Sequence, residues 1–277
     1  MIEGVAKGNL FIRDRLNCHN PTTARCVCFA KHLDGGSLIS GSLDSSIRIM
    51  PTKNPSAART LIGHVKGVTS IAVLEQAVIM VSAGFDRELL VWSLMGDRPH
   101  ARLRGHFSPV VQLECDESNT EVISLGSDGT IRVWDMRKMR CLQVLNSHAL
   151  SSAAGSATVQ LRGREVALAD AQPEPEDNAG GAEIRFPISS ICYDQYNRSL
   201  ITGNRGLLLW RSSQQGRLAV GSADRPRYHE GAVTCVAYSE EYELLASGDS
   251  HSTICVWEVR RNRTPASSDP SLTEFTC

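Results

Sequence analysis

The feature that most constrains this chain is an internal repeat of 42 residues. Met50 and Trp92 are 42 residues apart, and Trp134 follows after another 42. The aligned copies are SGSLDSSIRIM (40–50), SAGFDRELLVW (82–92), SLGSDGTIRVW (124–134) and SGDSHSTICVW (247–257), with a degraded copy in SLITGNRGLLLW (199–210). A period near 40 residues indicates small supersecondary units that bury their apolar faces against neighbouring units.

The hydrophobic pattern of the copies is typical of β-strands. Apolar residues alternate with others in VVQLEC (110–115), EVISL (121–125) and TIRVW (130–134), which is the period-two signature of a strand. Asp128-Gly129 between the last two predicts a tight hairpin with a type I′ turn. The sequence therefore predicts an all-β fold of small antiparallel sheets.

A Gly-His pair and a Trp-Asp pair frame the copies. Gly63-His64 and Gly105-His106 put a histidine 18 residues before Ser82 and Ser124, and His229 precedes Ser247 by the same 18. Together with Trp134-Asp135, these residues resemble the WD-repeat family over roughly residues 20–260. The resemblance implies a β-propeller of four-stranded antiparallel blades with five recognisable repeats.

The resemblance also implies a hydrogen-bonded network of His, Ser, Asp and Trp inside each blade. The residues concerned are His64, Ser82, Asp86, Trp92, His106, Ser124, Asp128, Trp134, His229, Ser247 and Trp257. Departures from the pattern are Met50 in place of Trp in the first repeat and His251 in place of Asp in the last. The repeat around Trp210 lacks the turn Asp, so these blades are expected to be less stable.

The same residue types raise the alternative of a Ser-His-Asp nucleophilic site. Such a serine stands on a strained, exposed turn, usually in a G-x-S-x-G setting, and this chain has no such elbow. A zinc site made of Cys18, His19, Cys26 and Cys28 lacks a second ligand cluster with suitable spacing. We therefore predict neither enzyme activity nor a metal or other cofactor.

The charge balance limits the classes of partner. Lys and Arg number 29 and Asp and Glu number 30, so there is no net field to attract nucleic acid or an anionic membrane. The N-terminus contains no apolar run of signal-peptide length, and no stretch approaches the length of a spanning helix. We expect a cytoplasmic protein whose partners are other proteins, with no small-molecule substrate.

Spacing and composition divide the chain into five parts. These are an outer strand of a preceding blade in 1–16, repeats 1–3 in 17–146, a low-complexity insertion in 147–184, repeats 4–5 in 185–261 and a disordered tail in 262–277. Within the insertion, TVQLRGREVALA (158–169) is compatible with an extra hairpin turning at Arg162-Gly163.

The number of repeats is small for a closed ring. Seven blades of 42 residues need about 294 residues, so the chain is an incomplete propeller or part of a seven-bladed ring. A fragment of a longer protein, a rare small ring, and a ring completed by another chain are the three alternatives. An open arc would present two unpaired edges, which favours the fragment.

Binding residues are expected on one rim of the disc. In WD-repeat propellers the residue before the turn Asp and the residues after Gly-His face that rim, which here selects Leu43, Phe85, Ser127, Val65, Phe107 and Pro109. Phe85 and Phe107 are candidate interface anchors, because large apolar side chains on polar loops often bind partners. The alternative is that they fold back to cap their own blades.

A narrower resemblance concerns the order of the repeats. The segments 84–145, 191–210 and 228–259 are similar to the EF-hand-associated WD-repeat proteins of motile cilia and sperm flagella. That likeness implies a scaffold with axonemal partners, but no D-x-D-x-D-G calcium loop is present. As an alternative, Trp134-Asp135-Met136-Arg137 is similar to the WD-x-R box with which substrate receptors dock onto cullin-RING ligase adaptors, making Arg137 a candidate contact.

Overall fold

A computed structural model describes residues 24–30, 36–146, 159–161, 164–166, 188–203, 207–212, 218–220, 229, 231–239, 241–259 and 275–276. The helical content of these ranges is one three-residue 3-10 turn, η1 (Pro55–Ala57). None of the helical structure in these ranges is long and apolar enough to cross a membrane.

Twenty of the strands form five four-stranded antiparallel sheets, which we call blades 1 to 5. Blade 1 contains β1 (Ala24–Ala30), β2 (Ser37–Ser42), β3 (Ser46–Pro51) and β4 (Arg59–Ile62). Blade 2 contains β5 (Val68–Leu74), β6 (Ile79–Gly84), β7 (Leu89–Ser93) and β8 (Pro99–Leu103). Blade 3 contains β9 (Val110–Asp116), β10 (Glu121–Gly126), β11 (Thr130–Asp135) and β12 (Arg140–Asn146). Blade 4 contains β15 (Ser190–Asp194), β16 (Ser199–Gly203), β17 (Leu207–Ser212) and β18 (Leu218–Val220). Blade 5 contains β19 (Val233–Ser239), β20 (Leu244–Asp249), β21 (Ile254–Val259) and β22 (Phe275–Thr276).

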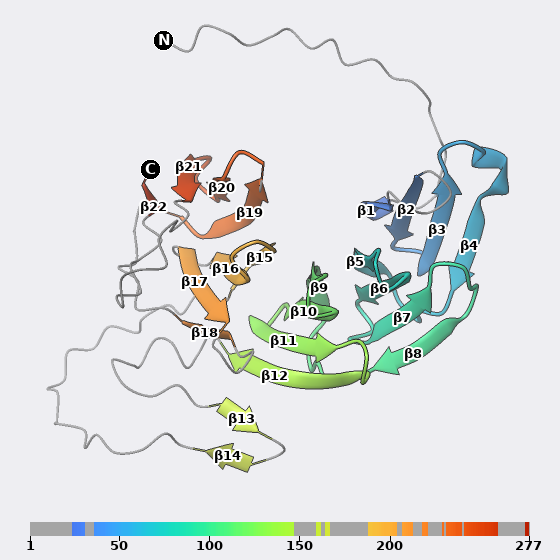
Figure 1. Cartoon of the computed structure of the whole chain (residues 1–277), viewed down its shortest axis with the longest axis horizontal. Coiled ribbons are helices and arrows are strands. Elements are labelled where there is room, and N and C mark those ends of the chain that lie inside the picture. Colours follow the sequence, from blue (N-terminus) through green and yellow to red (C-terminus); the bar gives the residue numbers. More distant parts are fainter. Residues whose placement is uncertain are drawn as a thin grey trace, which may run out of the picture.

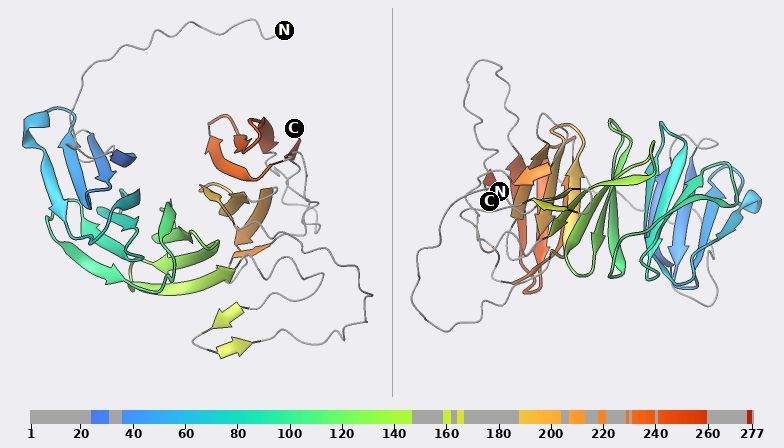
Figure 2. Two further views of the ribbon diagram at one scale, coloured as in Figure 1. Left: turned by 180° about the vertical axis from the view of Figure 1, so that it is seen from behind. Right: turned by 90° about the horizontal axis from the view of Figure 1, so that it is seen from below.

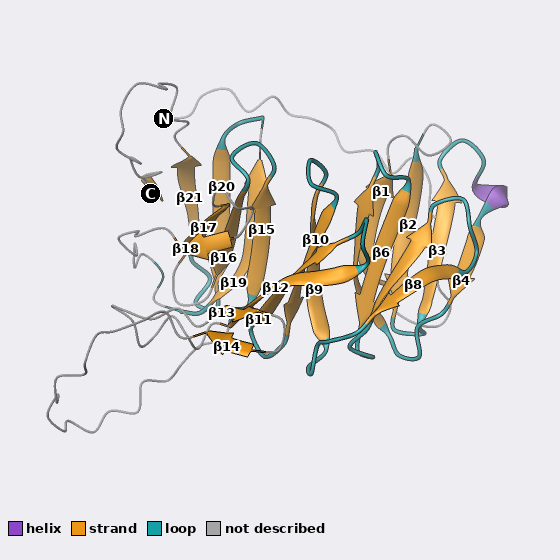
Figure 3. Ribbon diagram, turned by 60° about the horizontal axis from the view of Figure 1, so that its bottom comes forward, coloured by secondary structure: helices purple, strands orange, loops and turns teal. Residues whose placement is uncertain are grey.

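The blades stand side by side along an open arc. Strands β1, β5, β9, β15 and β19 lie on its concave side, and blades 1 and 5 occupy its two ends (Figure 1). Views from behind and from below show the same arrangement (Figure 2), and the strands of neighbouring blades run roughly alongside one another (Figure 3). The expected all-β architecture of four-stranded propeller blades is confirmed.

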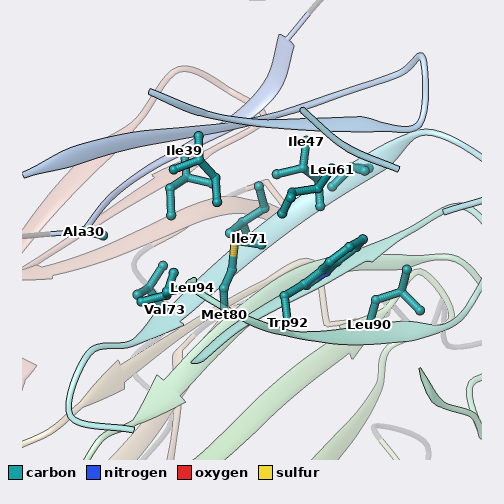
Figure 4. Packing of buried hydrophobic residues seen from close by; sticks show 12 residues of the cluster. Ala30, Ile39, Ile47, Leu61, Ile71, Val73, Met80, Leu90, Trp92 and Leu94 are labelled. Carbon is teal, nitrogen blue, oxygen red and sulfur yellow. The ribbon is translucent and has the colours of Figure 1, made fainter. Parts of the chain in front are cut away.

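Strand periodicity gives every blade two apolar faces. We call the face that carries Ile47 and Ile49 in blade 1 the forward face, and the opposite face, which carries Trp92 in blade 2, the tryptophan face. At the first junction, Ile39, Ile47 and Leu61 of blade 1 pack against Met80 and Trp92 of blade 2 (Figure 4).

The same contact recurs at the next three junctions. The forward face of each blade covers the tryptophan face of the following one, so Trp134, Trp210 and Trp257 are all buried at junctions. Each aliphatic side chain buried beside these tryptophans contributes about 1.5–3 kcal/mol. The junctions are therefore the main apolar cores of the described residues. The core is therefore divided among the junctions between blades.

One local prediction about turns is wrong. The Asp128-Gly129 hairpin is not a type I′ turn, because Gly129 N–H bonds the Gly126 carbonyl at 3.0 Å and Gly129 is the residue with positive φ (78°). The turn centres on Ser127 and Asp128, one residue earlier, and is followed by a left-handed residue. Ser45 (φ 70°) and Arg87 (φ 67°) occupy the same position in blades 1 and 2. The three-residue loop is therefore a feature of these repeats and does not require a glycine at that position.

The insertion and the tail show two further pairings. In the insertion, β13 (Val159–Leu161) pairs antiparallel with β14 (Arg164–Val166), as a hairpin around Arg162-Gly163 requires. In the tail, expected to be disordered, Phe275–Thr276 pair with Val259 and Glu258, because the outer edge of β21 offers unpaired backbone groups. The outer strand expected in 1–16 lies outside the described residues.

Candidate functional site

The polar network of blade 2 links a loop, two strands and a turn. The Trp92 indole N–H donates to Ser82 Oγ at 2.8 Å, and Ser82 Oγ lies 2.7 Å from His64 Nε2. Nδ1 of His64 lies 2.7 Å from the Asp86 carboxylate. If the Ser82 hydroxyl donates to Nε2 and Nδ1–H donates to Asp86, every polar atom of the set has a partner.

This geometry supports a structural role for the Ser-His-Asp set. Ser82 and the His64 side chain are both 0% exposed, so no substrate carbonyl can approach the hydroxyl. Burial opposes ionisation of Asp86, but hydrogen bonds from His64, Val65 N–H and Glu88 N–H outweigh it and lower the pKa of the carboxyl. The ionised Asp86 thus ties the Gly-His loop to the turn.

Blade 3 departs from the implied network at Asp128. His106 Nε2 still lies 2.7 Å from Ser124 Oγ, and Trp134 donates to that oxygen at 2.8 Å. Asp128 instead accepts Thr130 N–H at 3.0 Å and bonds the Ser108 hydroxyl, which competes for the carboxylate. His106 Nδ1 is therefore buried without a hydrogen-bond partner, and burial, aided by the Arg132 charge, lowers the pKa of His106 to about 4.

Blade 5 completes its network with a residue that the sequence alignment missed. His229 lies 2.6 Å from Ser247 Oγ and 3.2 Å from Asp249 Oδ2, and Trp257 donates to Ser247 at 2.8 Å. Asp249 stands two residues before the column occupied by His251. Burial would raise the pKa of Asp249, but hydrogen bonds from Thr253 N–H, His229 and His251 N–H lower it to about 2.

Blade 4 uses a threonine in place of the serine. Trp210 donates its indole N–H to Thr202 Oγ1 at 3.0 Å, eight residues apart rather than the ten of Ser82 and Trp92. A shorter turn therefore preserves the bond to the buried indole. Alignment on Trp210 indicates this substitution, because Thr is the hydroxyl residue at the matching strand position.

Exposed apolar side chains lie on one rim of the arc, in the β2–β3 and β6–β7 turns and in the loops before β5 and β9. Phe107 is 86% exposed, Val65 79%, Leu43 44% and Phe85 40%. We call these four residues the apolar rim. Phe85 N–H bonds the Gly67 carbonyl at 3.0 Å, and Arg87 donates to the Phe107 carbonyl at 3.4 Å, which joins blade 2 to blade 3. Pro109 lies beside the rim, half-buried, and its carbonyl accepts Ser127 N–H at 2.8 Å.

Arg137 lies in the β11–β12 turn, at the opposite end of the strands from the apolar rim. Its guanidinium donates to the Asn119 carbonyl at 2.6 Å and lies 3.9 Å from Asp135, while 65% of the side chain remains exposed. Burial and the neighbouring Asp116 and Asp135 raise the pKa of Glu121 to about 7, and Arg137 opposes that shift. Arg137 therefore compensates the local acidic charge of its own blade.

The described residues contain no group of three His, Cys, Asp or Glu side chains placed to hold a metal ion. The described cysteines form no disulfide with one another, and burial raises the pKa of Cys26 to about 11 and that of Cys115 to about 12. Thiols of this kind are poor nucleophiles at neutral pH. Cys18 and His19 of the rejected zinc site lie outside the described residues.

Comparisons with known proteins fit this geometry. The family model described as "WD domain, G-beta repeat" matches residues 12–49, 56–93, 97–135 and 227–258. Cilia- and flagella-associated protein 337 B of Tetrahymena thermophila is 36% identical over 106 residues, which is 38% of this chain and 8% of that protein. Cilia- and flagella-associated protein 52 of Chlamydomonas reinhardtii is 26% identical over 87% of this chain and 40% of its own length.

A structural match extends over most of the chain. It is to a chain in the crystal structure of the mitotic checkpoint complex, with a TM-score of 0.61 and 17% identity, covering 84% of this chain and 63% of the other. The chain spans half or less of the two ciliary relatives. Residues 136–226, where Thr202 replaces the network serine, fall outside the family-model matches.

Proposed function

Because the chain belongs to the WD-repeat family, we propose that it is a non-catalytic scaffold that binds another protein through its apolar rim. The observation that carries this proposal is the placement of Leu43, Val65, Phe85 and Phe107 on one side of three adjacent blades. Large apolar side chains that gather on a solvent-facing surface are the usual anchors of protein interfaces.

Hydrogen bonds hold the backbone of the apolar rim in place. The Asp86 carboxylate accepts hydrogen bonds from the His64 ring and from Val65 N–H, so the loop that carries Val65 and the turn that carries Phe85 are joined. Arg87 fixes the backbone of Phe107 relative to blade 2. A surface that is ordered before binding loses less conformational entropy when the partner arrives.

The proposed setting is the cilium or flagellum, with an axonemal protein as partner. Support comes from the two relatives named as cilia- and flagella-associated proteins, one of which is similar over 87% of this chain. A second support is the balanced charge, which provides no general attraction to nucleic acid or membranes.

Binding to purified axonemes tests the proposal. Wild-type chain is expected to sediment with axonemes, and the double variant Phe85→Ala plus Phe107→Ala is expected to remain in the supernatant. Met95→Ala plus Tyr196→Ala is the matched control, since those side chains are 66% and 67% exposed in turns at the opposite end of the strands. Equal sedimentation of all three proteins would contradict the proposal.

Docking onto a cullin-RING adaptor through Arg137 is the competing proposal. The observation in its favour is the exposure of the Arg137 side chain, although its guanidinium is already bound to Asn119. Arg137→Ala separates the two, because loss of adaptor binding supports the receptor role while axoneme binding through the rim should not change.

A further inference from the structure

The outer halves of blades 1 to 3 carry an excess of cationic side chains. Each outer half consists of the third and fourth strands of its blade with the turn between them, and β4, β8 and β12 place it on the convex side of the arc (Figure 1). Ten Lys or Arg and three Asp or Glu occur in these ranges, which are 46–62, 88–104 and 130–146. The inner parts of the same blades have the opposite excess, with three Lys or Arg and eight Asp or Glu in 24–30, 36–45, 63–87 and 105–129. The balanced charge of the whole chain therefore conceals a separation of charge within these blades.

Most of these cations face the solvent, whereas most of the acids beside them do not. The side chain of Asp97 is 72% exposed, but those of Glu88 and Asp135 are only 18% and 10% exposed. The exposed cations are Arg137, in the turn already described, together with Lys53, Arg98, Arg102, Arg104, Lys138 and Arg140. We call these exposed cations the cationic edge.

Contacts within blade 2 show how arginines of the cationic edge bind a carboxylate. Arg102 and Arg104 donate to the two oxygens of Glu88 at 3.1 and 2.7 Å. Two positive charges thus share one negative charge, and the Arg104 side chain stays 75% exposed. Because a guanidinium has several N–H donors in one plane, such an arginine can accept a second carboxylate from outside.

Protection of the sheet edges does not account for this pattern. Charged residues of either sign, and Lys above all, keep outer strands from pairing with other chains. In the outer halves the sign is nearly uniform, and eight of the ten cations are arginines. Arg is the residue that recognises planar anionic groups such as carboxylates.

From the charge separation and the arginine contacts we infer that the cationic edge binds an acidic segment of a partner protein. The Phe, Tyr and Trp residues of the outer halves are Trp92 and Trp134, and both are buried, so neither ring can stack with a base. A protein carboxylate therefore fits this surface better than a nucleic acid does. At physiological salt the attraction reaches about 8 Å, so the local excess of charge selects the partner. The cationic edge is separate from the apolar rim, and this inference is independent of the proposed function.

Fluorescence anisotropy with a labelled peptide of alternating Glu and Thr tests the inference on the full chain. Arg98→Glu plus Arg140→Glu is expected to weaken binding by about tenfold, because two exposed ion pairs are replaced by repulsions. Arg98→Gln plus Arg140→Gln is expected to show a smaller loss. The matched control is Lys66→Glu plus Arg198→Glu, which changes the net charge by the same amount at exposed positions outside the cationic edge and should bind like wild type.

The same measurement with a single-stranded RNA of equal charge separates the two classes of partner. We expect the wild-type chain to bind the RNA more weakly than the peptide. RNA binding as tight as peptide binding, no peptide binding by wild type, or equal losses in the Arg98 and Lys66 double variants would each overturn the inference. If the Glu variant unfolds, the Gln variant decides, since it adds no negative charge. Phe85→Ala plus Phe107→Ala should keep full peptide binding, so failure of the apolar rim and failure of the cationic edge are distinguishable.

Discussion

At the scale of single residues, the carboxylate that supports each network histidine differs among the blades. Asp86 supports His64 from the turn, Asp128 turns away to Ser108 and Thr130, and Asp249 supports His229 from two residues earlier in the chain. Whether a carboxylate supports the histidine thus depends on which other hydrogen-bond donors lie near that carboxylate. An alignment of the turn residues does not show those donors.

Removing Asp249 should destabilise blade 5 more than removing His251. Asp249→Ala takes away the partner of the buried His229 ring and the acceptor of two turn N–H groups, from His251 and Thr253. His251→Ala removes an exposed ring from the surface. We expect a lower thermal midpoint for Asp249→Ala and an unchanged one for His251→Ala, measured by circular dichroism. The reverse order would mean that the aligned position carries the support.

Glu114 provides a prediction about pH. Burial raises the pKa of Glu114 from 4.5 to about 7, although Gln112 and Tyr193 N–H hydrogen-bond the carboxylate. The folded chain thus holds a proton that the unfolded chain releases above pH 4.5, and ionisation destabilises the fold as pH rises towards 7 and beyond. Glu114→Gln should raise the free energy of unfolding at pH 8 by about 2–3 kcal/mol. The gain should vanish near pH 4.5 in urea titrations, and the exposed Glu241→Gln should show no such pH-dependent gain.

The role of a residue could be predicted from the sequence where its position in the repeat is enough to fix its contact. Spacing and family resemblance identified the bonds of Ser82, Ser124 and Ser247 to their Trp and His partners, because strand register fixes those distances. They did not identify Asp249 or the diversion of Asp128. Those outcomes depend on side-chain rotation and on Ser108, which lies 20 residues away in sequence.

At the scale of elements, the turns at the end opposite the apolar rim are tied from blade to blade. Glu117, after β9, accepts the N–H groups of Glu75 and Gln76, which follow β5, at 2.8 and 3.4 Å. Gln195, after β15, repeats the reach by accepting Glu117 N–H at 3.1 Å and donating to the Cys115 carbonyl at 2.6 Å. Each tie crosses a junction, so it holds the angle between neighbouring blades as well as the turn.

Hydrogen exchange should report the loss of one tie. In Glu117→Ala the amides of Glu75 and Gln76 lose their acceptor, and we expect them to exchange about five to ten times faster. Glu117→Gln keeps an acceptor oxygen and should show a smaller change. Amides in the centre of β5 should be unaffected, and uniform acceleration of the whole blade would contradict a local tie.

Strands were easier to predict than the turns between them. Alternating apolar residues fix which side of a strand is buried, so the strand expected in 130–134 and the β11 range of Thr130–Asp135 agree closely. The turn after β10 was assigned to the wrong type because Asp-Gly fits both two-residue and three-residue hairpins. Ser45 and Arg87 adopt the same left-handed conformation and carry no glycine signal.

At the scale of the whole molecule, the described chain is an arc in which four junctions repeat one contact. The repeat length made an incomplete ring predictable, since blade number follows from counting. Which face of a blade covers its neighbour did not follow from counting, because it depends on the direction in which each blade leans on the next. The burial of Leu89, Ile131 and Leu207 against the following blade shows that direction.

The division of the apolar core among four junctions also limits how far local damage spreads. A substitution that unpacks one junction, such as the junction around Trp210, leaves the apolar contacts of the other junctions in place, because each blade touches only its neighbours. Unfolding can therefore begin at one junction while the rest of the arc keeps its structure.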